Sequence, residues 1–408
     1  MKRTLITNIG MLATPQGTSA RGGRAQGEIC ILKNAWIFIE NDVIAQVGTG
    51  TAPAAVGVQI INAGGKLVTP GLVDAHTHLI FGGWRQNELA LKLHGAGYLD
   101  ILAAGGGILS TMRATKAASE EQLEAKASAA LDEMLRFGTT TAEAKSGYGL
   151  STEEECKALR VIGKLQKHHV MDLAATFMGA HAVPEAYRDN RQGYLELLCE
   201  EMLPAVREQG IAEFCDVFCE KGVFSAEESR RILLTGRQHG LRPKIHADEI
   251  EAIGGSELAG EIGAVSAEHL IVCPPSGIAS MARGGTVACC LPATSFYLGA
   301  AYAPVQDMVQ AGVPVAMATD FNPGSCPCLN MQLVISLGCL RYRLTPEQAL
   351  TAVTLNGAAA ICRADRIGSI EPGKQADILI WNAEDLDYIC YRLGSNLVDT
   401  VIKKGNVV

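Results

Sequence analysis

The sequence lacks the features of membrane, secreted and nucleic-acid-binding proteins. It has no run of about 18 apolar residues, so we expect no transmembrane helix. The first 15 residues lack a long apolar stretch with a small-residue cleavage site, which argues against a signal peptide. The net charge is −8 without any block of like charges, whereas phosphate binding needs clustered lysine and arginine. We therefore expect a cytoplasmic protein with no nucleic-acid or membrane partner.

Internal repeats, low-complexity segments and paired zinc-ligand cysteines are also absent from the sequence. The 13 cysteines are scattered, odd in number and carried by a long chain. Neither the Cys326/Cys328 spacing nor the Cys215/Cys219 spacing is a usual zinc-ligand pair. Buried free thiols are the interpretation that we favour.

What the sequence does contain is enough apolar material for a large core. Hydrophobic residues make up 48% of the 408 residues and charged residues 19%, both ordinary for a globular protein. This length fits one barrel of about 250 residues together with a smaller domain.

Short β-rich segments separated by turns occupy both ends of the chain. Such segments are 4–9, 29–33, 35–40, 43–47, 377–381 and 398–403. We expect the terminal segments 1–70 and 367–408 to pair in one small β-sandwich domain.

The middle of the chain, 71–366, alternates between short apolar segments and helical stretches. We identify eight apolar segments: 72–79, 139–145, 173–181, 213–218, 243–247, 264–269, 286–292 and 314–320. Capping boxes at Ser119 and Ser225 begin two of the helices, with Gly138 and Gly240 as their stops. Eight units of this length predict an α/β fold, a (β/α)8 TIM barrel.

Polar residues end several of these strands, where the active site of such a barrel lies. His76 and His78 are two positions apart, so on a strand they share a face and can hold a divalent metal. Alone, this pair could equally be two buried core histidines.

His246, His269 and Asp320 end three further strands. Each alone could be a buried histidine or a helix-capping aspartate, but their recurrence at strand ends predicts a metal site. A bound metal lowers the pKa of its water toward neutrality. Asp320 suits the roles of ligand and base together, while His269 and Glu249 could transfer protons or polarise a carbonyl.

These strand-end residues resemble those of the amidohydrolase superfamily, and the resemblance covers essentially the whole chain. The segment 373–378 is similar to the family's return into its terminal β-domain. Longer motifs resemble the imidazolonepropionase family within it; they occupy 81–85, 142–150, 179–184 and 320–325.

The resemblance implies both a ligand set and a substrate set. The implied metal ligands are His76, His78, His246 and Asp320. The implied contacts with substrate or product are Arg85, Tyr148, His181, Glu249, Asn322, Gly324 and Ser325.

The implied reaction is hydrolysis of the cyclic amide 4-imidazolone-5-propanoate to N-formimidoyl-L-glutamate, in histidine degradation. One zinc or iron ion per chain would serve it, since imidazole and carboxylate ligands suit both metals. The guanidinium of Arg85 offers a fork of donors for the propionate, although alone it could be a surface ion pair. The catalytic residues would be Asp320, His269 and Glu249. A homodimer is an open alternative to a monomer.

Two other functions remain as alternatives. A purine or pyrimidine deaminase would use the same metal site, although Arg85, Tyr148 and His181 favour a substrate with a carboxylate. A non-catalytic scaffold should have lost metal ligands, and none is missing here. Lys145 could carry a carboxyl group that bridges two metals, but we favour an ordinary ammonium paired with Glu143 or another carboxylate, and one metal.

Overall fold

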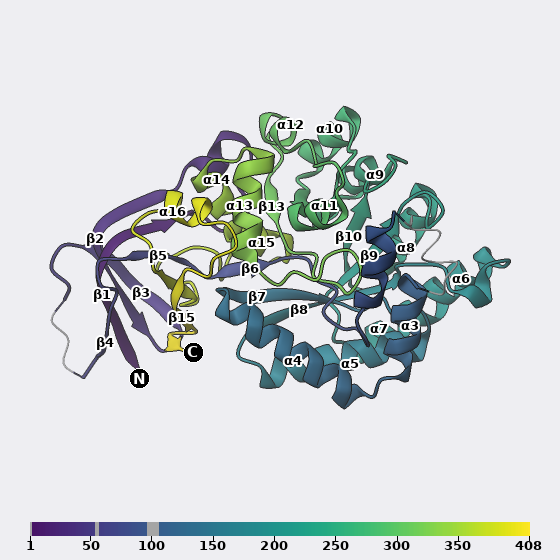
Figure 1. Ribbon diagram of the computed structural model, residues 1–408, viewed down its shortest axis with the longest axis horizontal. Helices are drawn as coiled ribbons and strands as arrows, with labels where there is room; N and C mark the ends of the chain where they lie inside the picture. Colours follow the sequence, from purple (N-terminus) through teal and green to yellow (C-terminus); the bar gives the residue numbers. More distant parts are fainter. Residues whose placement is uncertain (1, 54–56, 96–105) are drawn as a thin grey trace.

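The computed structural model describes residues 2–53, 57–95 and 106–408. Strands from the two ends of the chain form one sheet, and the middle of the chain forms a barrel beside it (Figure 1). The N- and C-termini lie near each other at the sheet end of the molecule (Figure 1).

The barrel contains eight strands, and every neighbouring pair among them is parallel. They are β6 (Leu72–Asp74), β7 (Thr139–Lys145), β8 (Asp172–Ala180), β9 (Phe214–Cys219), β10 (Arg242–Ala247), β11 (Ser266–His269), β12 (Val287–Cys290) and β13 (Val315–Met317). Each overlaps one of the eight apolar segments, and the strands follow one another around the barrel in chain order. The fold class predicted from the sequence is confirmed.

Hydrogen bonds beyond the strands close the barrel between its first and last members. The backbone N–H of Asp320 donates to the carbonyl of His76 over 3.0 Å, and the N–H of His78 donates to the carbonyl of Phe321 over 2.9 Å. The strands β6 and β13 themselves end earlier than expected, at Asp74 and Met317. The seam is therefore built by the same short segments that carry three of the expected metal ligands.

Helices surround the barrel, and α4 and α5 lie along β7 and β8 (Figure 1). The helices are α1 (Leu89–Leu93), α3 (Ile108–Ala117), α4 (Glu120–Arg136), α5 (Thr152–His168), α6 (Arg191–Glu196), α7 (Leu203–Gln209), α8 (Ala226–Gln238), α9 (Gly255–Ile262), α10 (Pro275–Gly284), α11 (Pro292–Leu298), α12 (Val305–Gln310), α13 (Met331–Tyr342), α14 (Pro346–Ala352), α15 (Leu355–Ala360) and α16 (Leu386–Tyr391). Single turns are η1 (Gly23–Gly27), η2 (Gln86–Glu88) and η3 (Glu185–Tyr187), and η4 (Leu197–Met202) is a π-helix. Both capping boxes are present, because Ser119 and Ser225 accept from the amides of Gln122 and Glu228.

The terminal sheet is built from both ends of the chain. Its strands are β1 (Arg3–Thr14), β2 (Cys30–Glu40), β3 (Val43–Thr49), β4 (Gln59–Asn62), β5 (Leu67–Pro70), β14 (Ile378–Trp381), β15 (Val398–Lys403) and β16 (Asn406–Val407). β5 pairs with β1 on one side and β14 on the other, which joins the two ends of the chain. β5 leads into β6 after one residue, so the sheet and the barrel are directly connected.

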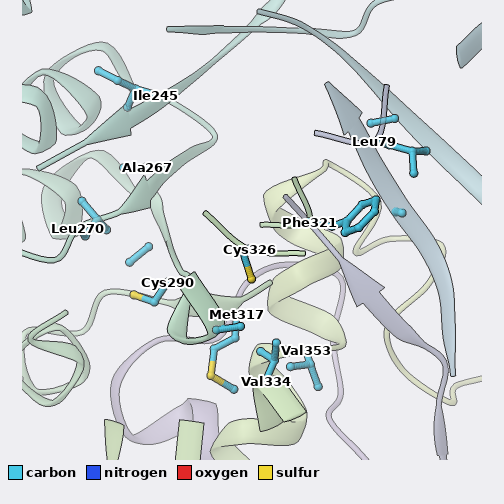
Figure 2. Close-up of a cluster of buried hydrophobic side chains, with 14 of the residues drawn as sticks. Leu79, Ile245, Ala267, Leu270, Cys290, Met317, Phe321, Cys326, Val334 and Val353 are labelled. Atoms are coloured by element: carbon cyan, nitrogen blue, oxygen red, sulfur yellow. The ribbon is translucent and has the colours of Figure 1, made fainter. Parts of the chain in front are cut away.

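Apolar side chains from strands and helices fill the space between the barrel wall and its helices. Met317 of β13 lies close to Val334 of α13 and to Val353, and all three are fully buried (Figure 2). The cysteines are free, and seven of the 13 are buried, as the sequence predicted. Among the described residues, no helix combines the length and apolarity that spanning a bilayer requires.

A buried lysine links the terminal sheet to the barrel. Lys403 of β15 is 1% exposed, and its Nζ lies 2.7 Å from Oδ2 of Asp377 and 2.7 Å from Oδ2 of Asp172 on β8. Burial of Asp172 opposes its ionisation, but Lys403 and Lys404 outweigh this effect and lower its pKa to about 2.

We predict that Lys403→Met lowers the free energy of unfolding by about 3 kcal/mol, because it leaves a buried carboxylate without a counter-ion. Lys404→Met is the matched control: its side chain is 42% exposed and also pairs with Asp172, so its loss should cost less than about 1 kcal/mol. Urea titration of the two variants measures both values. Equal effects would contradict the linking role of Lys403.

Candidate active site

Four side chains converge at the carboxyl ends of the barrel strands. His76 and His78 follow β6, His246 lies on β10, and Asp320 follows β13. Nε2 of His246 lies 3.3 Å from Nε2 of His78, and Oδ1 of Asp320 lies 3.5 Å from Nε2 of both His76 and His78. The four residues are almost completely buried. His269, on β11, offers a further ring nitrogen within 4.8 Å of those of His76 and His246.

The chemistry and spacing of these atoms fit one metal ion. Two nitrogens bound tetrahedrally to zinc at about 2.1 Å would lie about 3.4 Å apart, close to the spacing of the Nε2 atoms here. Nε2 of His76 is buried and has no hydrogen-bond partner among the described residues. Burial and neighbouring positive groups hold the pKa of both His76 and His78 well below the usual range. The rings are therefore neutral at pH 7, as metal ligands must be.

Two carboxylates that sequence reasoning missed hold the outer nitrogens of two histidines. Nδ1 of His76 lies 3.0 Å from Oε2 of Glu268 on β11, and Nδ1 of His246 lies 3.1 Å from Oδ1 of Asp216 on β9. Both carboxylates are completely buried in the barrel. The signal that could have found them is a charged residue inside an otherwise apolar strand segment, since such a charge needs a partner.

Two lysines balance these carboxylates in the barrel interior. Nζ of Lys145 lies 2.7 Å from Oδ2 of Asp216 and 2.8 Å from Oε2 of Glu143. Nζ of Lys244 lies 2.9 Å from Oε1 of Glu143 and 3.5 Å from Oε1 of Glu268. All five side chains are fully buried. We call these five residues the ion network.

The expected ion pair between Lys145 and Glu143 is thus present, with Asp216 as a second partner. Burial alone would lower the pKa of Lys145, but Asp216 and Glu143 reverse this effect and raise it above its usual value. These two ion pairs favour the ammonium form of Lys145.

Asp320 is fixed from two sides. Its Oδ2 accepts a hydrogen bond of 2.7 Å from the hydroxyl of Thr294, which leaves Oδ1 facing the histidines. Burial raises the pKa of Asp320, and His269 partly offsets that rise. Asp320 and His269 also have left-handed backbone, with φ of 56° and 69°. Such strain in residues other than glycine gathers at functional sites.

His269 and Glu249 form a pair at the edge of the cluster. Nε2 of His269 lies 3.6 Å from Oε2 of Glu249. Burial lowers the pKa of His269 to about 3 and raises that of Glu249 to about 7. Near neutral pH the carboxyl of Glu249 can therefore either take or give a proton.

Arg85 lies on a loop, and hydrogen bonds to the nearby Glu88 hold its guanidinium in place. Its Nε and Nη2 donate to the two oxygens of Glu88, each over 2.9 Å, and Glu88 also accepts from the N–H of Gly107. A Cβ on Gly324 would lie 2.1 Å from Nη1 of Arg85, so the guanidinium reaches its place only because residue 324 is glycine. Glu88 was not anticipated from the sequence.

Tyr148 and His181 complete the wall beside His78. The ring of His181 stacks on that of His78 with centroids 4.9 Å apart, and the ring of Tyr148 lies 5.2 Å from that of His181. Nδ1 of His181 lies 3.0 Å from the carbonyl of Gly147 and must donate to it, so Nε2 keeps its lone pair. Burial holds the pKa of His181 at about 3 and raises that of Tyr148. Both side chains are therefore neutral.

A buried carboxylate holds the loop that carries Tyr148. Glu155 accepts from the backbone N–H groups of Gly147, Gly149 and Leu150, over 2.8 to 3.0 Å. Sequence reasoning also missed this residue.

Asn322 and Ser325 bond to their own loop. Oδ1 of Asn322 accepts from the N–H groups of Gly324 and Ser325, and its Nδ2 donates to the carbonyl of Asp320 and to Oγ of Ser325. The side chain of Asn322 thus shapes the turn that follows Asp320. The structure brings Asn322, Gly324 and Ser325 to the site through this turn.

Comparison with known proteins agrees with this geometry. The model of the amidohydrolase family matches residues 67–408. The chain is 50% identical to an imidazolonepropionase of Alkaliphilus metalliredigens, with 100% of this chain and 98% of that protein covered. It is 51% identical to an imidazolonepropionase of Alkaliphilus oremlandii, with 99% and 97% covered.

The chain belongs to the amidohydrolase family, on its imidazolonepropionase branch. The family is metal-dependent, which agrees with the cluster of histidine and aspartate side chains. A solved guanine deaminase of E. coli has a TM-score of 0.76 at 16% identity, with 100% of this chain and 99% of that chain covered. This likeness shows the shared fold.

We predict that the purified protein holds one tightly bound metal per chain and an unmodified Lys145. A carbamate at Lys145 would place a negative charge against Asp216 and Glu143, where the ammonium now balances both. Elemental analysis measures the metal, and ¹³C NMR after incubation with labelled bicarbonate detects a carbamate. Two metals per chain, or a carbamate signal that Lys145→Arg abolishes, would contradict the prediction.

Proposed function

We propose that this protein hydrolyses 4-imidazolone-5-propanoate to N-formimidoyl-L-glutamate, the cyclic-amide hydrolysis of histidine degradation. The observation that carries the proposal is the combination of the His/Asp metal cluster with the guanidinium of Arg85, which lies against Gly324 in the turn that follows Asp320. Relatives named imidazolonepropionase share half of the residues over the full chain.

His76, His78, His246 and Asp320 would hold the metal, which we propose to be zinc or iron. When bound, it would polarise the ring carbonyl and lower the pKa of water at the site. Three imidazoles and one carboxylate suit either ion.

Asp320 takes the proton of the attacking water. Its Oδ1 faces the histidines while the hydroxyl of Thr294 donates to Oδ2, and this hydrogen bond favours the orientation with Oδ1 toward the site. The rise in pKa caused by burial makes it a better base than an exposed aspartate.

Glu249 and His269 complete the proton transfer. A ring C–N bond breaks only when its nitrogen leaves with a proton, and Glu249, with a pKa of about 7, can carry one near neutral pH. His269 lies between Glu249 and the ligand cluster, and its neutral ring can donate toward the carbonyl oxygen.

Arg85 binds the propionate, and Tyr148 and His181 orient the ring. The Tyr148 hydroxyl can donate a hydrogen bond to a carbonyl of the substrate, and the free Nε2 of His181 can accept one from a ring N–H. Asn322, Gly324 and Ser325 support this end of the substrate: their turn gives Arg85 its space and offers polar groups at the rim.

Neither rival function accounts for the same features. A purine or pyrimidine deaminase would share the fold and the metal cluster, but its substrate has no carboxylate for Arg85. A scaffold without activity would not need four intact ligands or the buried carboxylates behind them. We further propose that the protein acts on a small molecule only and is cytoplasmic. We also propose a homodimer, which sedimentation analysis would test.

The proposal is tested by hydrolysis of imidazolonepropionate by the metal-replete protein, beside guanine, cytosine and dihydroorotate. We expect turnover of imidazolonepropionate alone. Faster turnover of guanine or cytosine would replace the proposal with the deaminase alternative.

We predict that Asp320→Asn lowers kcat by at least about 10²-fold, because the amide keeps an oxygen ligand but cannot take a proton. Activity is measured at matched metal content, since the substitution also touches the metal. Full activity in a metal-replete Asn variant would remove Asp320 from the proton-transfer role.

We predict that Arg85→Ala costs about 1.5–3 kcal/mol in kcat/KM, the scale of a hydrogen bond to a charged group, with metal content unchanged. Gly324→Ala should act in the same direction by displacing the guanidinium. Arg188→Ala is the matched control, because Arg188 also pairs with a glutamate three positions away but is 70% exposed. An Arg85→Ala variant that behaves like the control would exclude Arg85 from carboxylate binding.

A further inference from the structure

Two of the ligand histidines are held by carboxylates, and this fixes which ring nitrogen carries the proton. Asp216 faces Nδ1 of His246 at 3.1 Å, and Glu268 faces Nδ1 of His76 at 3.0 Å. An ionised carboxylate can only accept a hydrogen bond. Nδ1 must therefore carry the hydrogen in both rings, and Nε2, on the other side, keeps its lone pair.

The other two histidines of the cluster lack such support. Nδ1 of His78 and Nδ1 of His269 are buried and have no hydrogen-bond partner in the part of the chain that the structure describes. No carboxylate holds Nδ1 of either ring; the side chains near them face Nε2 instead. Among these four histidines, a carboxylate at Nδ1 is thus specific to His76, which follows β6, and His246, which lies on β10; their ring centroids are 4.6 Å apart.

The lysines of the ion network keep these carboxylates in the accepting state. The second oxygen of Asp216 is 2.7 Å from Nζ of Lys145, and the second oxygen of Glu268 is 3.5 Å from Nζ of Lys244. Glu143 joins the two lysines at 2.8 and 2.9 Å. Because all five groups are fully buried, neither carboxylate can exchange its lysine for water.

The network also carries an unbalanced charge. Three carboxylates and two ammonium groups give the ion network one net negative charge. A buried charge of this kind is stabilised by a cation nearby.

We propose that Asp216 and Glu268 are positioning residues, which hold His246 and His76 in the Nδ1–H tautomer so that both Nε2 lone pairs face the metal site before any metal binds. The inference rests on the metal site of the proposed function and deepens it. Lys145 and Lys244 act one step further away, by holding the two carboxylates in place.

The test begins with the metal-free wild-type protein, labelled with ¹⁵N in its nine histidines. Side-chain ¹⁵N spectra distinguish a protonated Nδ1 from a protonated Nε2, and the signals of His76 and His246 are assigned by their loss in His76→Asn and His246→Asn. We expect Nδ1–H in both rings. Nε2–H in both would overturn the proposal without the use of any carboxylate variant.

The variants Asp216→Asn and Glu268→Gln then change the hydrogen-bond chemistry at nearly constant shape. An amide NH2 can donate to Nδ1, which would move the ring hydrogen to Nε2 and aim it at the metal site. We expect this tautomer change in the metal-free protein and a rise in the zinc dissociation constant of roughly 10–100-fold, the usual scale for such outer partners. Competition with a chromophoric chelator measures the zinc affinity.

Asp172→Asn is the control, since it also removes a lysine-paired carboxylate but lies at the opposite end of the barrel and contacts no histidine of the cluster. It should change neither tautomer nor zinc affinity. Zinc bound as tightly by both site variants as by this control, with tautomers unchanged, would overturn the proposal while leaving the metal site intact. Wild-type protein that binds neither zinc nor iron would instead refute the metal site of the proposed function.

Discussion

The rest of the site depends on the ion network, in which two buried lysines pair with three buried carboxylates inside the barrel. Most barrels of this class fill their interior with branched apolar side chains. Here Lys244 of β10 reaches Glu143 of β7, although β9 and β8 separate those strands in the barrel wall, so the contact crosses the interior. Losing either lysine would leave buried carboxylates without a counter-ion. The strands must therefore keep their relative positions, and the metal ligands keep theirs.

Much of the fold was readable from the sequence because the barrel strands are short, apolar and separated by well-marked helices. The spacing of His76 and His78 along one strand predicted that they lie together, and the structure places them so. The role of Arg85 came from a resemblance and stays a prediction. The strands β4 and β5 escaped notice, since four-residue segments carry little periodicity. Asp216 and Glu268 escaped notice for another reason: their role depends on which histidine lies opposite, and that is decided by the closure of the barrel.

At the proposed substrate end of the site, some residues are placed to contact the substrate and others support the loops that carry them. The motif that includes Asn322, Gly324 and Ser325 resembles a set of substrate contacts, which stays a prediction. In the structure the amide of Asn322 also folds the turn, and Gly324 makes room for Arg85. Glu88, three positions after Arg85, fixes two of the guanidinium nitrogens. A sequence motif cannot distinguish a residue that contacts the substrate from one that supports the loop, because both roles require the same residue type at the same position.

The seam that closes the barrel has a consequence for how the protein is made. Asp74 and Thr319, which bond to each other at the seam, are 245 positions apart in the chain. During translation His76 and His78 are synthesised long before Asp320. The metal cluster therefore stays incomplete while most of the barrel is synthesised. Contacts of such long range form late in folding. The four side chains of the metal cluster can therefore meet only after the last barrel strand has been made.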